Sequence, residues 1–178
     1  MIPPLIVRRA RALGLGLIAV TDHNTTENAG AVMRAAEGSG VVVLPGMELQ
    51  TQEEVHLLCL FDTLDQAHTW QTLVDERLPQ LKNRKEFFGA QYIVDQTGDL
   101  IRQDEQLRQT AAALSLDEAV ERVRAMGGLP IAAHVDRRAN GLLHILGFVP
   151  TDLPLAALEL SPSVPPDLAA LRYPQVQG

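Results

Sequence analysis

The sequence predicts an α/β protein in which helices alternate with the short strands of a mostly parallel sheet or barrel. Short, wholly apolar runs recur along the 178-residue chain, as in strands that a parallel sheet buries on both faces. Stretches with apolar residues three or four positions apart separate these runs, which is the period of an amphipathic helix. Because helices lie between most strands, parallel neighbours are favoured. A content of 46% apolar residues is that of an ordinary globular chain.

The first half of the chain contains two helix–strand units, then a third strand and another helix. Glycines are expected to end the first two helices, at Gly14 and at Gly38-Ser39-Gly40. Pro45-Gly46 is expected to close the second strand. In chain order, the expected elements are helix 6–13, strand 17–21, helix 29–36, strand 41–44, strand 55–61 and helix 64–78.

The second half begins with a polar excursion over residues 79–114 that interrupts the alternation. Within it, runs at 90–94 and 100–101 flank a turn-forming segment and predict a small hairpin. Ser115-Leu116-Asp117-Glu118 then matches a capping box, in which a serine hydroxyl and a glutamate carboxylate each bind a free amide at a helix start. Strands are expected after this helix, over 129–133 and 155–160.

Charge and composition restrict the partners. Fifteen Lys and Arg against 22 Asp and Glu give a net charge of −7, which repels phosphate backbones, so duplex nucleic acid is not expected as a partner. The single cysteine, Cys59, lies in an apolar run and is expected to be buried and inert. Because one cysteine cannot form a disulfide within the chain, a reducing cytoplasm fits best. No run approaches the roughly eighteen apolar residues of a membrane span. Arg8-Arg9 is not expected to start an export signal, because no small-residue cleavage site follows the apolar run.

Side chains that suit a metal ion lie at the ends of the predicted strands. His23 follows the first strand directly, Glu48 follows the second, His56 begins the third and His134 follows the fourth. In such folds, ligands bind outside the carboxyl ends of the strands. Imidazole nitrogens and carboxylate oxygens are accepted by zinc, manganese and iron. Asp22 joins this group because it is adjacent to His23.

Each of these residues also has a structural explanation. A solitary histidine is more often a hydrogen-bonded structural residue than a ligand, so the pattern carries the argument. His68 and His144 fall in helix or loop context and are expected to be surface or packing residues. Arg137 and Arg138, just past His134, are candidates to pair with a substrate phosphate, or else they belong to a solvated turn.

Four segments in this order resemble the PHP family, named for polymerase and histidinol phosphatase. They are Leu17-Ile18-Ala19-Val20-Thr21-Asp22-His23-Asn24-Thr25, Leu44-Pro45-Gly46-Met47-Glu48, Val55-His56-Leu57-Leu58 and Gly127-Gly128-Leu129-Pro130-Ile131-Ala132-Ala133-His134. The resemblance covers almost the whole chain and implies one domain over 1–178, a distorted, incomplete (β/α) barrel. It also implies hydrolysis of phosphoesters with two or three divalent metals.

The resemblance also implies roles for individual residues. Glu48, His56 and His134 match the ligands of one metal, with Glu48 bridging to a second, and His23 matches a ligand of a third. Glu48 and His134 are therefore the expected catalytic residues. Asp22 would support a ligand without binding the metal.

The chain departs from the family pattern at both ends. A strand carrying His-x-His and another carrying Asp-x-His are absent, so the first and last metal-binding strands are expected to be missing. Val135 also follows His134, where the family commonly has proline. At most one well-formed site for zinc, manganese or iron is therefore expected, with three protein ligands and a position for water.

Three functions remain open. The leading hypothesis is a metal-dependent phosphoesterase that acts on a small phosphorylated substrate or a nucleotide. The second is a degenerate PHP domain with little catalysis, acting as a binding or scaffolding module. The third is an unrelated α/β protein in which the histidines at the strand ends are coincidental.

A barrel without its terminal strands exposes backbone edges and apolar surface, which favours pairing with another chain. Self-association, as a homo-oligomer, is therefore expected. Size-exclusion chromatography with light scattering should show species larger than the 19.4 kDa monomer. A single monomeric species at high protein concentration would contradict this prediction.

Overall fold

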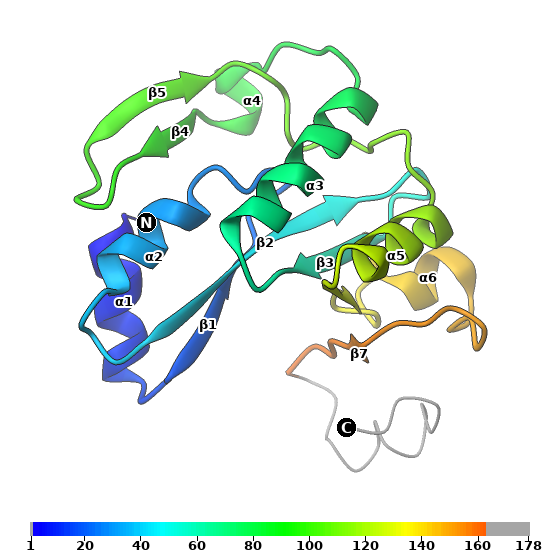
Figure 1. Cartoon of the computed structure of the whole chain (residues 1–178). Helices are drawn as coiled ribbons and strands as arrows, with labels where there is room; N and C mark the ends of the chain where they lie inside the picture. Colours follow the sequence, from blue (N-terminus) through cyan, green and yellow to red (C-terminus); the bar gives the residue numbers. More distant parts are fainter. Residues whose placement is uncertain (1, 163–178) are drawn as a thin grey trace.

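The structure, a computed structural model, describes residues 2–162 as an α/β fold around a curled five-stranded sheet (Figure 1). The predicted α/β class and incomplete barrel are confirmed. The strands are β1 (Leu17–Val20), β2 (Val42–Gln50), β3 (His56–Leu60), β4 (Gln91–Val94), β5 (Leu100–Asp104), β6 (Leu129–Ala132) and β7 (Ala157–Leu158). The helices are α1 (Pro3–Ala12), α2 (Ala29–Ala36), α3 (Leu64–Arg77), α4 (Lys85–Phe88), α5 (Leu116–Ala125) and α6 (Leu142–Leu146).

The direction of β3 decides which residues meet at one edge of the sheet. The strand order is β1-β2-β3-β6-β7, and β3 is antiparallel to both of its neighbours while the outer pairs are parallel. Four strands therefore run in one direction and β3 runs in the other. Because β3 is reversed, its first residue, His56, lies where β2 and β6 end. Gln50, the last residue of β2, pairs with His56.

The second strand continues past Pro45-Gly46, where the sequence predicted its end. Residues Val42 to Pro45 pair with β1, and Gly46 to Gln50 pair with β3. At the change of partner, a Cβ on Gly46 would lie 2.8 Å from a Leu60 methyl carbon and 2.9 Å from the Cys59 carbonyl oxygen, so only glycine fits. Glu48 consequently lies within β2 instead of after it.

The first strand is not buried on both faces, in contrast to the prediction. It lies at the edge of the sheet, and its residues alternate between exposed and half-buried. Ile18 and Val20 pack against the cluster formed by α1 and α2, whereas Leu17 is 58% exposed. A wholly apolar run therefore indicated a strand correctly but not its burial, because nothing in the described chain covers the second face.

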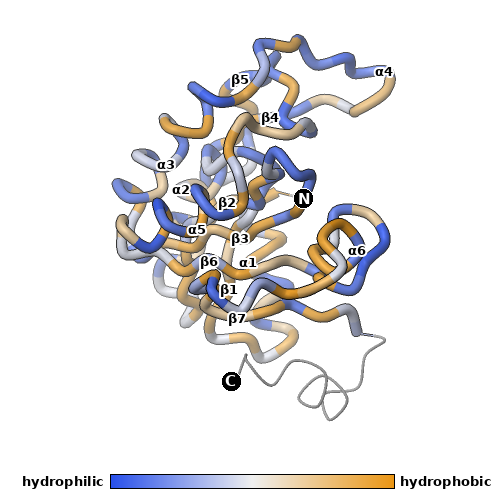
Figure 2. Tube along the Cα trace, turned by 90° about the vertical axis from the view of Figure 1, so that its right-hand side faces the viewer, coloured by the Kyte–Doolittle hydropathy of each residue, from blue (hydrophilic) through white to orange (hydrophobic). Residues whose placement is uncertain are grey.

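The main core lies between β2, β3 and β6 and the helices α3 and α5. Figure 2 shows apolar residues concentrated along the central strands and hydrophilic residues toward the outer turns. Cys59 is fully buried there, and burial raises the pKa of its thiol, in agreement with the predicted inert cysteine. Within residues 2–162, no helix has the length and apolar character to cross a membrane. The largest fully buried side chains of the main core include Trp70, Phe61, Met47, Leu49, Leu57 and Leu114.

Helix starts differ in one detail from the prediction. Ser115 Oγ caps α5 by accepting a hydrogen bond from the Glu118 amide at 3.2 Å. The Glu118 carboxylate, however, accepts from Arg122 and Arg77 and does not complete the box. The full capping box lies at α3, between Thr63 and Gln66. Its glutamine falls where a glutamate is the more familiar signal.

The hairpin of β4 and β5 stands apart from the main sheet, within the polar stretch 79–114 (Figure 1). Asn28, just before α2, connects it to the rest of the fold. Its Nδ2 donates to the Tyr92 carbonyl at 3.1 Å, and its Oδ1 accepts from the Val94 amide at 3.1 Å. These bonds place the hairpin next to the end of β1.

Replacing Trp70 should show how far the main core stabilises the fold. Trp70→Ala is expected to lower the free energy of unfolding by about 3–5 kcal/mol, because it leaves a large cavity. Trp70→Phe should lower it less, since Trp70 Nε1 is buried without a hydrogen-bond partner among the described residues, so its removal leaves no group unpaired there.

Denaturant-induced unfolding measures both values. Leu100→Ala is the control, because Leu100 is 62% exposed and its loss should change the free energy by no more than about 0.5 kcal/mol. Equal destabilisation by Trp70→Ala and Leu100→Ala would contradict the assigned core.

Candidate metal centre

Three histidines and one glutamate from separate segments meet at the edge of the sheet where β3 begins. His23 follows β1, Glu48 lies in β2, His56 starts β3 and His134 lies two residues after β6. Glu48 Oε1 is 2.9 Å from His56 Nδ1 and 3.1 Å from His134 Nε2. Glu48 Oε2 is 3.6 Å from His23 Nδ1. The structure therefore brings together all four residues that the sequence predicted as metal ligands.

Backbone pairing beyond the named strands places His23 beside Glu48. The two residues form an isolated parallel bridge after β1 ends. The Glu48 amide donates to the Asp22 carbonyl at 3.1 Å, and the Asn24 amide donates to the Glu48 carbonyl at 3.0 Å. The main chain thus fixes the spacing of these two side chains.

Asn24 holds the loop after His23, a role that the sequence analysis missed. It is fully buried and has a φ of 47°, a left-handed conformation that asparagine tolerates better than most residues. Its Nδ2 donates to the carbonyls of Arg108 at 2.7 Å and Thr110 at 2.8 Å. Its Oδ1 accepts from the Gln50 amide at 2.9 Å. An asparagine directly after a candidate ligand is the signal that could have identified it.

His134 lies in a turn after β6 with a φ of 30°, an uncommon backbone conformation outside glycine. Its amide donates to Glu159 Oε2 at 2.9 Å, and its Nε2 lies 3.2 Å from His56 Nδ1. Residues held in such conformations often cluster at functional sites. The remaining ring nitrogen, Nδ1, is buried without a hydrogen-bond partner among the described residues.

The histidines keep Glu48 ionised. Burial alone would raise the pKa of its carboxyl. The hydrogen bond with His56, the charges of His23 and His56, and the hydrogen bond with His134 outweigh burial and lower this pKa from 4.5 to about 2. The cluster therefore contains a carboxylate across the pH range in which most proteins are folded.

The cluster has the composition and spacing of a site for a divalent cation. Ligands about 2.1 Å from a tetrahedral ion lie roughly 3.4 Å from one another. The contacts of Glu48 with the three imidazoles, and of His56 with His134, run from 2.9 to 3.6 Å. The ligand atoms of His23, Glu48 and His56 all lie within 4.8 Å of one another. His134 differs from a usual ligand in one respect. A metal-bound histidine normally donates its other N–H to an acceptor, whereas His134 Nδ1 has no hydrogen-bond partner among residues 2–162.

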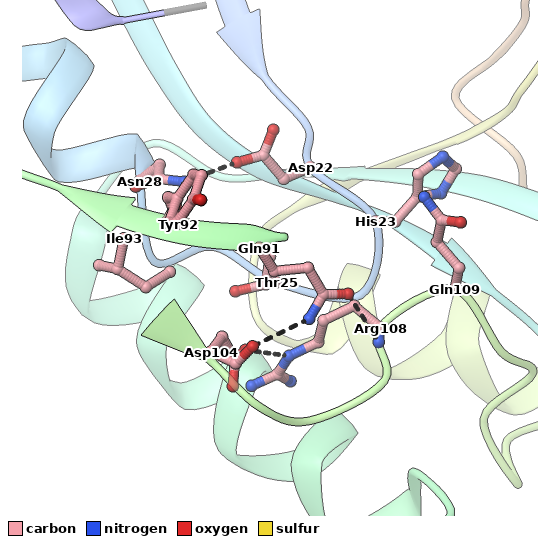
Figure 3. A pocket seen from close by; sticks show the side chains of 10 residues that line it. All are labelled: Asp22, His23, Thr25, Asn28, Gln91, Tyr92, Ile93, Asp104, Arg108 and Gln109. Carbon is pink, nitrogen blue, oxygen red and sulfur yellow. Dashed lines mark hydrogen bonds and ion pairs between the residues drawn. The ribbon is translucent and has the colours of Figure 1, made fainter. Parts of the chain in front are cut away.

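The structure distinguishes the other residues that the sequence singled out. The Asp22 carboxylate turns toward Asn28, whose Nδ2 donates to it at 3.3 Å (Figure 3). The Asp22 carbonyl accepts from the Glu48 amide, and no hydrogen bond joins the Asp22 carboxylate to a candidate ligand among residues 2–162, so its supporting role stays a prediction. His68 on α3 and His144 on α6 are exposed and lie outside the cluster.

An open cleft of about 330 Å³ gives access to the cluster. Arg137 lines it, whereas Arg138 does not, although both are exposed. No ion pair of Arg137 occurs in the part of the chain that the structure describes. The cleft is lined by His23, Glu48, Gln50, His56, Gln109, Arg137 and Asn140.

Solved structures share this fold, although no protein-family model and no curated protein matches the chain. One is a protein from Bifidobacterium adolescentis provisionally assigned as a metal-dependent phosphoesterase, with a TM-score of 0.62 and 18% identity, over 98% of this chain and 77% of that one. Another is the lesion-specific endonuclease Q of Pyrococcus furiosus, with a TM-score of 0.61 and 20% identity, over 96% of this chain and 40% of that one. At these identities, the likeness shows a shared fold.

Endonuclease Q also corrects one prediction. Its complex with a 27-mer duplex that holds an abasic lesion at the active site matches with a TM-score of 0.61 and 18% identity, over 94% of this chain and 40% of that one. Excluding duplex nucleic acid on the ground of a net charge of −7 was therefore wrong. Net charge is a sum over the whole surface, whereas salt screens the interaction of each exposed charge beyond roughly 8–10 Å. The charged groups nearest a site therefore decide what binds there.

Metal content tests the cluster. His134→Ala should weaken binding of Mn²⁺ or Zn²⁺ at least about tenfold, because it removes a predicted ligand, whereas His68→Ala should leave binding unchanged. Elemental analysis after dialysis against each metal, with calorimetric titration of the apoprotein, measures this. Equal loss of metal in the two variants would count against the cluster.

Proposed function

We propose that this protein is a metal-dependent phosphoester hydrolase of the PHP type. The observation that carries the proposal is the meeting of three imidazoles and one ionised carboxylate beside an open cleft, which His23, Glu48 and His56 line. Glu48, His56 and His134 would hold the cation, and His23 would be a further ligand on the exposed side. Zinc, manganese and iron all suit this donor set.

Different residues of the chain would bind the cation and orient the substrate phosphate. A cation bound there would supply a water of lowered pKa and polarise a phosphoryl oxygen. Glu48 would contribute the negative charge that binds the cation, and His134 would fix its position, so we assign catalytic importance to both. Arg137 would pair with the phosphate oxygens through its planar guanidinium group, because it lines the cleft and has no ion-pair partner within residues 2–162.

Substrate size follows from the cleft. A volume of about 330 Å³ suits a small phosphorylated molecule or a nucleotide. The fold shared with a provisionally assigned phosphoesterase and with an endonuclease supports phosphoester chemistry.

A second candidate function is a binding module with little catalysis. One observation favours it. Within residues 2–162, the structure contains a single group of metal-ligating side chains, whereas phosphoryl transfer commonly uses a second metal to share the charge of the transition state. Such a module would bind a phosphorylated ligand without turning it over.

Hydrolysis of 4-nitrophenyl phosphate by the apoprotein, with and without added Mn²⁺, Zn²⁺ or Fe²⁺, separates the two functions. We expect metal-dependent turnover, together with a rise in Tm on metal addition. Arg137→Ala should lower kcat/KM about 10- to 100-fold, the equivalent of a lost hydrogen bond to a charged group. Arg138→Ala is the matched control and should have little effect.

Stable metal binding without turnover would favour the binding module. No metal binding and no rise in Tm would remove the hydrolase function. Equal effects of the two arginine substitutions would refute only the proposed role of Arg137 and would leave the hydrolase function standing.

A further inference from the structure

A second cleft, of about 210 Å³, adjoins the candidate metal centre (Figure 3). It lies between the end of β1 and the β4–β5 hairpin, and the segment after β5 closes one side. His23 and Gln109 line both clefts, so a molecule at the metal centre would reach directly into the second one. The alcohol part of a bound phosphate ester would therefore extend into this space.

The charges around this cleft do not attract an anion. Arg108 is the only Lys or Arg that lines it in the described chain. Its Nε donates to Asp104 Oδ2 at 2.7 Å, and its Nη1 pairs with Asp75. Two carboxylates thus offset one guanidinium group, and Asp22 adds a further negative charge at the rim. A second phosphate or carboxylate of a ligand would be repelled here.

Two uncharged side chains of the cleft are free to contact a ligand. Tyr92 is 54% exposed, and neither its hydroxyl nor the side-chain amide of Gln109 has a hydrogen bond within residues 2–162. Gln91, by contrast, is occupied, because its Oε1 accepts from the Arg108 amide at 3.2 Å and its Nε2 donates to the Gln106 carbonyl. The cleft therefore offers an aromatic face and uncharged hydrogen-bonding groups.

We propose that this cleft binds the alcohol part of the phosphate ester and accepts a ring-sized group without negative charge. The proposal rests on the proposed hydrolase function, and it names the substrate class of that site. A volume of about 210 Å³ is below the range of about 300–1,000 Å³ for drug-sized ligands, so one ring or sugar fills it. Tyr92 supplies the face for the ring, and Gln109 bonds to its polar substituent.

The test compares phenyl phosphate with 4-carboxyphenyl phosphate, which differ by one negative charge on the ring. The wild-type protein, loaded with Mn²⁺, should show a kcat/KM about tenfold higher for phenyl phosphate. Gln109→Lys places an unpaired cation at the mouth of the cleft and should reduce this ratio several-fold. The control Gln96→Lys, at the exposed hairpin turn, should leave the ratio unchanged. Intrinsic reactivities of the two esters cancel when the ratios of two proteins are compared.

A second variant tests the aromatic face. Tyr92→Ala should lower kcat/KM for phenyl phosphate about tenfold, the order of a lost ring contact, and should have no effect on methyl phosphate. Leu100→Ala, on the same hairpin and outside the cleft, is its control. Calorimetric binding of both aryl esters is measured in parallel, so that the subsite has a readout independent of turnover.

The outcomes separate the two proposals. Hydrolysis of both aryl esters, with their ratio unaffected by Gln109→Lys and kcat/KM for phenyl phosphate unaffected by Tyr92→Ala, would overturn the subsite and leave the hydrolase. Absent hydrolysis, with phenyl phosphate bound more tightly than its carboxylated analogue and weakened by Tyr92→Ala, would overturn the hydrolase and support the subsite. No binding of either ester would overturn both.

Discussion

The carboxylate of Glu48 is the contact on which the candidate site depends. One oxygen lies within 3.1 Å of His56 and His134, and the other lies 3.6 Å from His23. A partly buried carboxylate is unfavourable unless it is paired, and here the imidazoles outweigh burial and lower its pKa to about 2. The same side chain therefore joins the ends of several sheet segments and provides the charge that would attract a cation.

A buried polar network beneath the site connects it to the excursion between α3 and α5. Asn24 bonds to two carbonyls of this segment, and Arg108 of the segment donates back to the Asn24 carbonyl at 3.2 Å. Arg108 is itself paired with Asp104 and Asp75. This network holds Gln109 between the two clefts. An irregular, polar part of the sequence thus becomes a wall of the site, because buried polar groups must find partners and these partners come from distant segments.

Local charge and total charge lead to different conclusions about what this protein binds. The total of −7 says little about a cleft that is lined by His23, by His56 and by Arg137, which has no ion pair among residues 2–162. A few ångströms away, the second cleft is lined by a compensated arginine and by carboxylates. Under the proposed function, phosphate would be favoured in the first cleft and disfavoured in the second, which would orient an ester with a single phosphate.

The sequence by itself determined most helices and strands and the four residues that converge, because periodicity and strand-end positions are local properties. It could not determine the reversal of β3, the passage of β2 through Pro45-Gly46 or the exposed face of β1. It also left Arg137 and Arg138 equivalent and missed Asn24, whose partner Arg108 is 84 residues away. These features depend on which segments become neighbours, and only the tertiary structure decides that, since contacts between distant residues leave no periodic signal in the chain.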